Sequence, residues 1–274
     1  MALEGKVALV TGSSQGIGQG IVLRLAQAGA NVVINYRSHP EGAEETLAKV
    51  QALSAERKSE GTVGSCLLAQ CSSAQGHTIQ ADLGSIQEVR QLIAESIEHF
   101  GKLDILVNNA GIEKHAPFLD VSEADYDAVL NVNLKGGCLA TQAFVQHLTE
   151  TKRPGKVTNI SSVHEDLPFP NFAAYCISKG GLKMLTRNLA VELGSLGITI
   201  NNVAPGAIET PINTQLLNNP QKFSTLLSNI PLGRLGQPQD VASLVAFLSS
   251  SEADYITGST FFVDGGLLWN YQEQ

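Results

Sequence analysis

Short apolar runs alternate with longer amphipathic stretches along the whole chain. Between the runs, apolar residues recur at helical spacing, as Ile21, Val22 and Leu25 do after the first run. Continuous apolar strands that alternate with helices are typical of βαβ units and of a parallel sheet covered on both faces. We therefore expect an α/β fold whose strands include residues 7–10, 32–34, 104–107, 157–160, 198–203 and 260–266.

No linker or change of composition interrupts this alternation, so the pattern predicts a single domain over residues 1–274. Two segments stand out from it. Residues 54–76 are polar and small, and they are long for a connection between a helix and a strand, which predicts a surface loop or a short extra hairpin. Residues 208–231 read as short-helical and more polar than the rest, which predicts a lid over the substrate.

The chain is acidic, with 18 Lys and Arg against 26 Asp and Glu and a net charge of -8. That balance argues against nucleic acid and anionic membranes as partners, because both require a basic surface. No apolar run approaches the ~20 residues that span a bilayer, and the first residues lack a signal core, so we expect a cytoplasmic protein. Four cysteines without metal-ligand spacing are expected to be free thiols and to bind no metal: Cys66, Cys71, Cys138 and Cys176.

A glycine-rich turn lies between the first strand and the first helix, with glycines at 12, 16 and 18. Such glycines allow a tight turn and a close approach of the backbone to a phosphate, while the helix N-terminus offers free N–H groups. The turn therefore predicts a dinucleotide site. The alternative is a plain glycine-rich turn.

The second strand ends without the acid that usually accepts a hydrogen bond from the ribose 2′-hydroxyl of NAD. Arg37 and Ser38 stand there instead and suit a 2′-phosphate, so NADP is favoured and NAD remains possible. Arg37 as a solvated loop charge is the alternative. Asp82 follows the third strand, where it either meets the adenine or caps the helix that starts at Ser85.

Tyr175 and Lys179 are four residues apart, roughly one helical turn, so a helix places both on one face. A cation beside the phenol favours the phenolate, and we expect it to lower the pKa of Tyr175 towards that of a general base. Ser162 follows an apolar strand, and its hydroxyl is expected at the carboxyl edge of the sheet. Asn133 lies within a predicted helix, an unfavourable place for asparagine unless its side chain has a function.

These motifs, in this order, resemble the short-chain dehydrogenase/reductase family over essentially the whole chain: Thr11-Gly12-x-x-x-Gly16-x-Gly18, Asn108-Asn109-Ala110-Gly111, Ser162, Tyr175-x-x-x-Lys179, Pro205-Gly206 and Val263-Asp264-Gly265-Gly266. The resemblance implies a doubly wound (Rossmann) sheet of seven strands and a homotetramer. It also implies a catalytic tetrad. In it Tyr175 exchanges the proton, Ser162 binds the same oxygen, Lys179 binds the nicotinamide ribose, and Asn133 positions a water.

The resemblance further implies a set of cofactor contacts that spans the chain. Gln15 stands where many NADP-dependent members carry a basic residue, which weakens the preference for NADP. The implied cofactor residues are Gly12, Ser14, Gln15, Gly16, Ile17, Gly18, Arg37, Ser38, Asp82, Leu83, Asn109, Tyr175, Lys179, Pro205, Gly206, Ile208 and Thr210.

Within the family, the chain looks most like the bacterial glucose 1-dehydrogenases, through residues 35–38, 111–113, 161–165 and 206–213. That likeness implies a sugar pocket lined by Glu113, Ser162, His164 and Tyr175, and oxidation of an aldose such as glucose at C1 to the lactone. The alternative for His164 is that it and Glu165 only order their loop.

Two other functions stay open. An NADPH-dependent carbonyl or 3-oxoacyl-thioester reductase would use the same tetrad, but its acidic carrier predicts a basic patch that the sequence does not offer. A catalytically silent NADP(H)-binding sensor is less favoured, because all four residues of the tetrad are present.

Overall fold

The computed structural model describes residues 2–60, 74–211 and 219–270, and in this part of the chain seven parallel strands form one sheet. The strands are β1 (Val7–Val10), β2 (Asn31–Tyr36), β3 (Gly76–Gln80), β4 (Ile105–Asn108), β5 (Gly155–Ile160), β6 (Ile198–Pro205) and β7 (Thr260–Val263). Their order is β3-β2-β1-β4-β5-β6-β7, so β3 and β7 are the edges.

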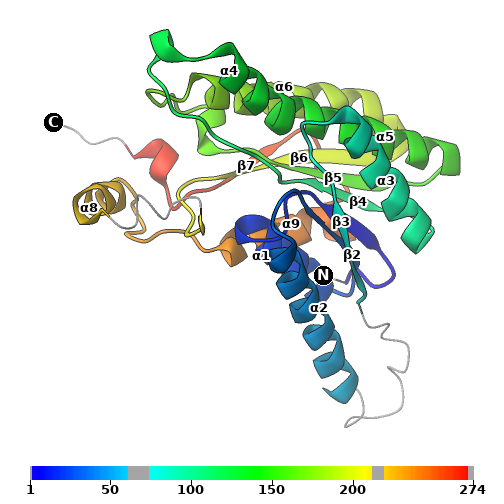
Figure 1. Cartoon of the computed structure of the whole chain (residues 1–274). Coiled ribbons are helices and arrows are strands. Elements are labelled where there is room, and N and C mark those ends of the chain that lie inside the picture. Colours follow the sequence, from blue (N-terminus) through cyan, green and yellow to red (C-terminus); the bar gives the residue numbers. More distant parts are fainter. Residues whose placement is uncertain (1, 61–73, 212–218, 271–274) are drawn as a thin grey trace.

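Helices cover both faces of the sheet (Figure 1). One face carries α1 (Gly16–Gln27), α2 (Pro40–Glu60) and α9 (Pro238–Ser249). The other carries α3 (Ile86–Phe100), α4 (Glu123–Leu130), α5 (Gly137–Thr151) and α6 (Ala173–Leu193). The short helix α8 (Pro220–Ser228) lies apart from both layers, on the side where the C-terminal residues lie.

The central strands are apolar throughout because each of their two faces enters a different core. In β1, Ala8 and Val10 pack in the core under α1 and α9, whereas Val7 and Leu9 pack in the core under α3 and α5. These side chains are at most 1% exposed, and each large one contributes about 1.5–3 kcal/mol through burial. The continuous apolar runs thus correctly indicated buried parallel strands.

The strand order reverses next to β1, which pairs with β2 on one side and β4 on the other. Connections leave the sheet in opposite directions at this point, and open α/β sheets bind their ligands at the carboxyl ends of the strands beside such a reversal. The expected doubly wound α/β sheet is therefore confirmed.

The two unusual segments are described only in part. Helix α2 continues through Glu60, so the stretch expected to be a loop or hairpin from Ser54 begins as helix, and residues 61–73, with Cys66 and Cys71, lie outside the described residues. Within the segment expected to be a lid, α8 is helical and residues 212–218 lie outside the described part. Cys138 and Cys176 are free thiols. No helix in the described part is long and apolar enough to cross a membrane.

Candidate active site

The turn between β1 and α1 forms an open cradle of backbone N–H groups. Gly12 and Gly16 have φ of 60° and 59°, a conformation that favours glycine. Gln15 occupies the N-cap of α1 but makes no side-chain capping hydrogen bond. The first N–H groups of α1 therefore remain available as hydrogen-bond donors. Together with the positive end of the helix dipole, they fit the pyrophosphate of a dinucleotide.

Asn109 holds this turn in place. Its Nδ2 donates to the carbonyl oxygens of Thr11 and Gly12, both at 2.9 Å. A Cβ on Gly18 would lie 2.5 Å from the same Nδ2, which is why this position is glycine. The sequence assigned Asn109 to the ribose region, but the structure commits its amide to the shape of the pyrophosphate turn.

Asn35 is a second support of the turn, and sequence reasoning missed it. Its Oδ1 accepts from the Gly12 N–H at 2.9 Å, and its Nδ2 donates to the carbonyls of Ile79 and Ala81 at 3.3 and 3.2 Å. A polar residue at the end of an apolar strand was the available signal. Arg37 and Ser38 follow it and are exposed beyond the end of β2.

Asp82 does not cap α3, so that alternative is wrong. Ser85 is the N-cap and accepts from the Glu88 N–H at 3.4 Å, while the Asp82 carboxylate accepts from Gly84 N–H at 2.8 Å. Leu83 is buried, at 5% exposure, so its side chain packs in the core.

The exit of β6 brings the residues expected at the nicotinamide end close to the turn. Gly206 N–H donates to the Val263 carbonyl at 3.0 Å, and Ile208 is buried and bridges to Gly236. A Cβ on Gly16 would lie 3.5 Å from Cγ2 of Thr210. The loop after β6 therefore passes over the start of α1, as a cofactor-covering segment must.

Tyr175 and Lys179 lie one turn apart on α6, next to the end of β5. The Lys179 Nζ donates to the Ile160 carbonyl at 2.9 Å and lies 5.4 Å from the centroid of the Tyr175 ring. Ser162 follows β5, and its Oγ accepts from His164 N–H at 3.2 Å while its hydroxyl also hydrogen-bonds Tyr175. The three side chains that the sequence predicted to act together thus converge.

Asn133 lies in η2 (Asn131–Gly136), a π-helical segment between α4 and α5. Its Oδ1 accepts from the Ile112 N–H and its Nδ2 donates to the Ile112 carbonyl, both at 2.8 Å. The Nδ2 also donates to Ser178 Oγ at 3.2 Å. The side chain therefore ties the loop after β4 to α6, and this function explains an asparagine within a helix.

The expected lowering of the Tyr175 pKa is wrong for the free protein. Burial of the phenol raises the pKa of Tyr175 to about 12, outweighing the Ser162 hydrogen bond, which lowers it, and the Glu113 carboxylate raises it further. Burial also lowers the pKa of Lys179 to about 8. The charged form of each group loses solvation on burial, which favours the neutral phenol and the neutral amine.

Comparison with known proteins agrees with this geometry. A family model described as enoyl-(acyl carrier protein) reductase matches residues 12–268. The 3beta-hydroxysteroid dehydrogenase 1 of Eggerthella lenta is 39% identical over 265 residues, covering 97% of this chain and 94% of that protein. Glucose 1-dehydrogenase 2 of Bacillus subtilis is 37% identical over 266 residues, covering 97% and 95%. The chain belongs to the short-chain dehydrogenase/reductase family.

A solved structure of the family matches the fold over nearly the whole chain. The gluconate 5-dehydrogenase from Burkholderia cenocepacia, in complex with NADP and tartrate, has a TM-score of 0.82 at 35% identity and covers 98% of both chains. This short-chain dehydrogenase is an NAD(P)-dependent oxidoreductase that acts on hydroxyl or carbonyl groups. The uncapped α1 turn fits that cofactor.

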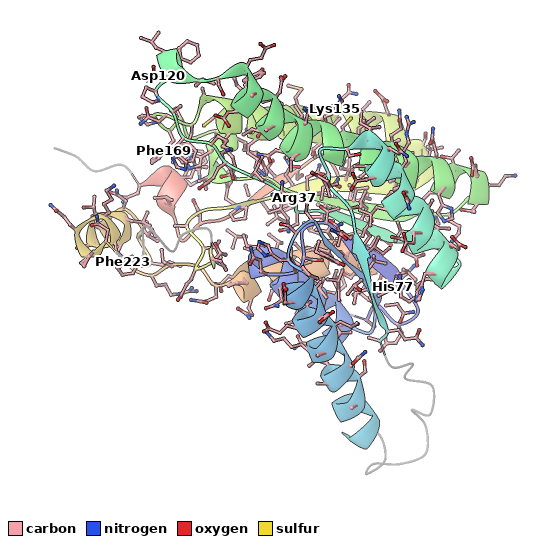
Figure 2. All side chains as sticks on the ribbon, in the orientation of Figure 1. Arg37, His77, Asp120, Lys135, Phe169 and Phe223 are labelled. Carbon is pink, nitrogen blue, oxygen red and sulfur yellow. The ribbon has the colours of Figure 1, made fainter. Side chains whose placement is uncertain are left out.

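Two histidines and two phenylalanines form a ring cluster that reaches Tyr175, and sequence analysis only partly found them. Phe172 lies 5.9 Å from Tyr175 between ring centroids, and His115 packs edge-on against Phe172 at 3.9 Å. Phe169 packs against Phe172 at 5.0 Å, and Figure 2 shows it on the loop that precedes α6. Only their position in loops that flank the catalytic residues could have pointed to them.

His164 and Glu113 lie where the sugar pocket was expected, near Tyr175. The His164 ring centroid is 6.1 Å from that of Tyr175, and its Nδ1 contacts the Leu167 carbonyl at 3.0 Å. A carbonyl only accepts, so Nδ1 carries the proton and Nε2 of the neutral ring is an acceptor. Glu113 Oε1 lies 3.2 Å from His115 Nε2, which makes the two an acid–imidazole pair at the loop after β4.

Proposed function

We propose that this short-chain dehydrogenase oxidises an aldose, such as glucose, at C1 to the lactone. The observation that carries the proposal is the pair Glu113 and His164 near Tyr175: the His164 ring lies 6.1 Å from the Tyr175 ring, and the charge of Glu113 acts on the Tyr175 phenol. Each hydroxyl of a bound sugar needs a partner once water is excluded. A carboxylate and an imidazole Nε2 supply acceptors for the hydroxyls around C1, and His115 Nε2 contacts the Glu113 carboxylate at 3.2 Å.

In the proposed mechanism, Tyr175 takes the proton from the C1 hydroxyl while Ser162 hydrogen-bonds the same oxygen. Bound NAD(P) supplies the acceptor for the hydride. Lys179 binds the nicotinamide ribose and favours the phenolate of Tyr175. Because the Asn133 amide is committed to Ile112 and Ser178, the backbone of its π-helical turn, rather than its side chain, would hold the relay water.

The proposal predicts an enzyme that works best in alkaline solution, because burial keeps the Tyr175 phenol neutral at pH 7. The test follows the absorbance of reduced nicotinamide while the purified protein receives glucose and other aldoses, with NAD and NADP in parallel. Reduction by an aldose supports the proposal. Oxidation of NADPH with a 3-oxoacyl thioester, and no reduction by any aldose, contradicts it and favours the reductase.

The variant Glu113→Gln tests whether Glu113 binds the sugar. It removes the acceptor charge but keeps the size of the side chain, so the KM for the aldose is expected to rise. It also removes a charge that raises the pKa of Tyr175, so the acidic limb of the pH profile is expected to move to lower pH. A variant with unchanged KM would argue against Glu113 as a sugar ligand.

A second candidate substrate is a secondary alcohol on a large apolar ring system. Phe169 is 51% exposed beside the Tyr175 site, and Phe118 and Leu119 of the neighbouring loop are also exposed. Such rings bind apolar skeletons through burial. The steroid activity named for the Eggerthella lenta relative agrees with this candidate. A 3-hydroxysteroid in the same assay distinguishes the two, through the ratio of its kcat/KM to that of glucose.

We further propose that NADP is preferred over NAD. Arg37 stands exposed after β2, where a ribose 2′-phosphate would lie. Asn35, at the place of a 2′-hydroxyl acceptor, is already bound to the turn and to β3.

We also propose that the enzyme is a homotetramer. Ile177, Met184 and Val191 recur at heptad spacing along α6, and all three are exposed in the single chain. An apolar stripe of this kind on an otherwise polar surface favours association, and a second copy of the same helix would bury it.

A further inference from the structure

Glu165 is a buried acid that the tetrad does not include. It ends η3 (Val163–Glu165), directly after Ser162, and its side chain is 0% exposed. Its Oε2 accepts from Asn202 Nδ2 at 3.2 Å, while Oε1 has no hydrogen-bond partner among the described residues. A buried carboxylate costs several kcal/mol unless a cation compensates it. Its presence there therefore requires a counter-ion.

A continuous line of side-chain hydrogen bonds leads to this carboxylate through the core. It crosses β4, β5 and β6 and connects them to α5 and α6. Such a network has little freedom to move, because each member fixes its neighbour. Its members are Thr141, Asn108, Asn159, Thr186, Asn202 and Glu165.

Lys183 compensates Glu165 only in part. Its Nζ lies 3.8 Å from Glu165 Oε1, beyond hydrogen-bonding distance, and it donates instead to the Asp166 carboxylate. Lys179 precedes Lys183 by one turn of α6, so the two amines extend from the same face of the helix. Lys179 is 4% exposed, and its Nζ donates to the neutral Ile160 carbonyl.

We propose that Glu165 is a positioning residue for the reaction: its buried carboxylate is the counter-ion that keeps Lys179 an ammonium beside Tyr175. The carboxylate stands on the rigid polar line described above, and it acts on the amine through space rather than through a hydrogen bond. Burial lowers the pKa of Lys179, and the charge of Glu165 raises it again. Glu165 itself touches none of the reacting atoms.

The other charged groups near this pair act elsewhere. Glu113 faces Tyr175, and its charge raises the pKa of that phenol. Asp166 is bound to Lys183. His164 donates from Nδ1 to the Leu167 carbonyl and faces the aromatic rings. Of these acids, Glu165 alone has a fully buried side chain, and its Oε1 lies 3.8 Å from the amine of Lys183, one turn along the same face of α6 as Lys179.

The inference rests on the proposed roles of Tyr175 and Lys179, but its test needs no substrate. The full-length protein is acetylated with limiting acetic anhydride at a series of pH values, and the fraction of Lys179 modified is read by mass spectrometry of its peptide. The midpoint of this curve reports proton binding by Lys179. In Glu165→Gln, which keeps the size and the acceptor for Asn202, the midpoint is expected to fall by about one pH unit or more.

Two further variants decide between a charge effect and a structural effect. Asp166→Asn changes the same charge one residue away and is expected to leave the midpoint unchanged. Glu165→Asp keeps the charge but withdraws it from α6, so its midpoint should lie between those of the wild type and Glu165→Gln. That variant also keeps the inference testable if Glu165→Gln does not fold.

The kinetic readout follows from the same reasoning. With whichever alcohol the wild type oxidises fastest, the alkaline limb of kcat/KM is expected to move to lower pH in Glu165→Gln. An unchanged midpoint, together with an equal loss of rate at every pH, would overturn the inference and leave Glu165 a structural anchor for Asn202. Failure of all aldoses as substrates would contradict the proposed function but leave the acetylation result intact.

Discussion

The Lys179 Nζ lies 5.4 Å from the centroid of the Tyr175 ring, and both groups are withdrawn from water enough to change their proton affinities. Burial favours the neutral form of each, so it raises the pKa of the phenol and lowers that of the amine. In the free enzyme the pair is therefore assembled, but the phenol remains protonated at neutral pH. The environment, and not the spacing alone, decides the pKa of Tyr175, the proposed base.

Tyr175→Phe is expected to lower kcat about 10²–10⁴-fold, because it removes the group that accepts the proton. The ring remains packed against Phe172, so the fold should be unaffected. NADPH binding, measured by fluorescence titration, should change by less than about twofold, because the turn after β1 is untouched. Substantial turnover by this variant would show that another group is the base.

Lys179→Met tests the burial of the amine through the pH dependence of stability. The wild-type amine has its pKa near 8 when folded and near 10.5 when unfolded, so between these values the unfolded chain binds more protons. Stability of the wild type must then rise with pH across this window. Relative to Lys179→Met, the wild type is expected to gain up to roughly 3 kcal/mol in free energy of unfolding from pH 8 to pH 10.5.

Urea denaturation of both proteins at a series of pH values measures this difference. If the two stabilities remain parallel across the window, folding does not lower the pKa of Lys179.

Gly18→Ala should impair the cofactor turn. The new Cβ would lie 2.5 Å from Asn109 Nδ2, so the amide that holds the Thr11 and Gly12 carbonyls must move. We expect a loss of about 1–3 kcal/mol in stability and weaker binding of NADP. Gly194→Ala is the control, because a Cβ there meets nothing within 4 Å and its φ is -57°. That variant is expected to be stabilised by about 0.5–1 kcal/mol.

Chemical denaturation and cofactor titration of the two glycine variants measure these effects. Equal behaviour of both variants would mean that Asn109 does not constrain the turn.

Arg37→Gln tests the cofactor preference. If the guanidinium binds a 2′-phosphate, the KM for NADP should rise about 10–100-fold, as expected for a lost charged hydrogen bond of about 1.5–3 kcal/mol. The KM for NAD should stay within about twofold, because NAD carries no such phosphate. Arg24→Gln, in the last turn of α1, removes the same charge away from the turn and should alter neither value. An equal rise in the KM for NADP and for NAD would contradict the proposed preference for NADP.

Met184→Glu tests the assembly. A charge in the centre of the apolar stripe on α6 should reduce the tetramer to smaller species in size-exclusion chromatography with light scattering. Tyr255→Glu places the same charge on another exposed site, after η6 (Ser251–Ala253), and should leave the mass unchanged. If the wild type is itself a monomer, the proposal that the apolar stripe on α6 mediates assembly is wrong.

Much of the fold was predictable, because strands that are buried on both faces of the sheet appear in the sequence as continuous apolar runs. The strands around β1 and β4 follow those runs, and Ser162, Tyr175 and Lys179 converge as their places after β5 and on α6 indicated. The start of the predicted loop at Ser54 was wrong because polar, small residues can extend a helix as α2 does. Local composition alone does not distinguish a loop from an extension of the preceding helix.

The sequence by itself determined the sheet, the glycine-rich turn and the side chains that we propose as catalytic, since each depends on neighbours within a few residues or on a periodic pattern. The tertiary structure alone decided what those side chains meet. Asn35 reaches the glycine turn and β3, Glu165 meets Asn202 from another strand, and burial sets the pKa of Tyr175. Desolvation and hydrogen bonding depend on residues far apart in the chain, so only the packed sheet and its helices determine them.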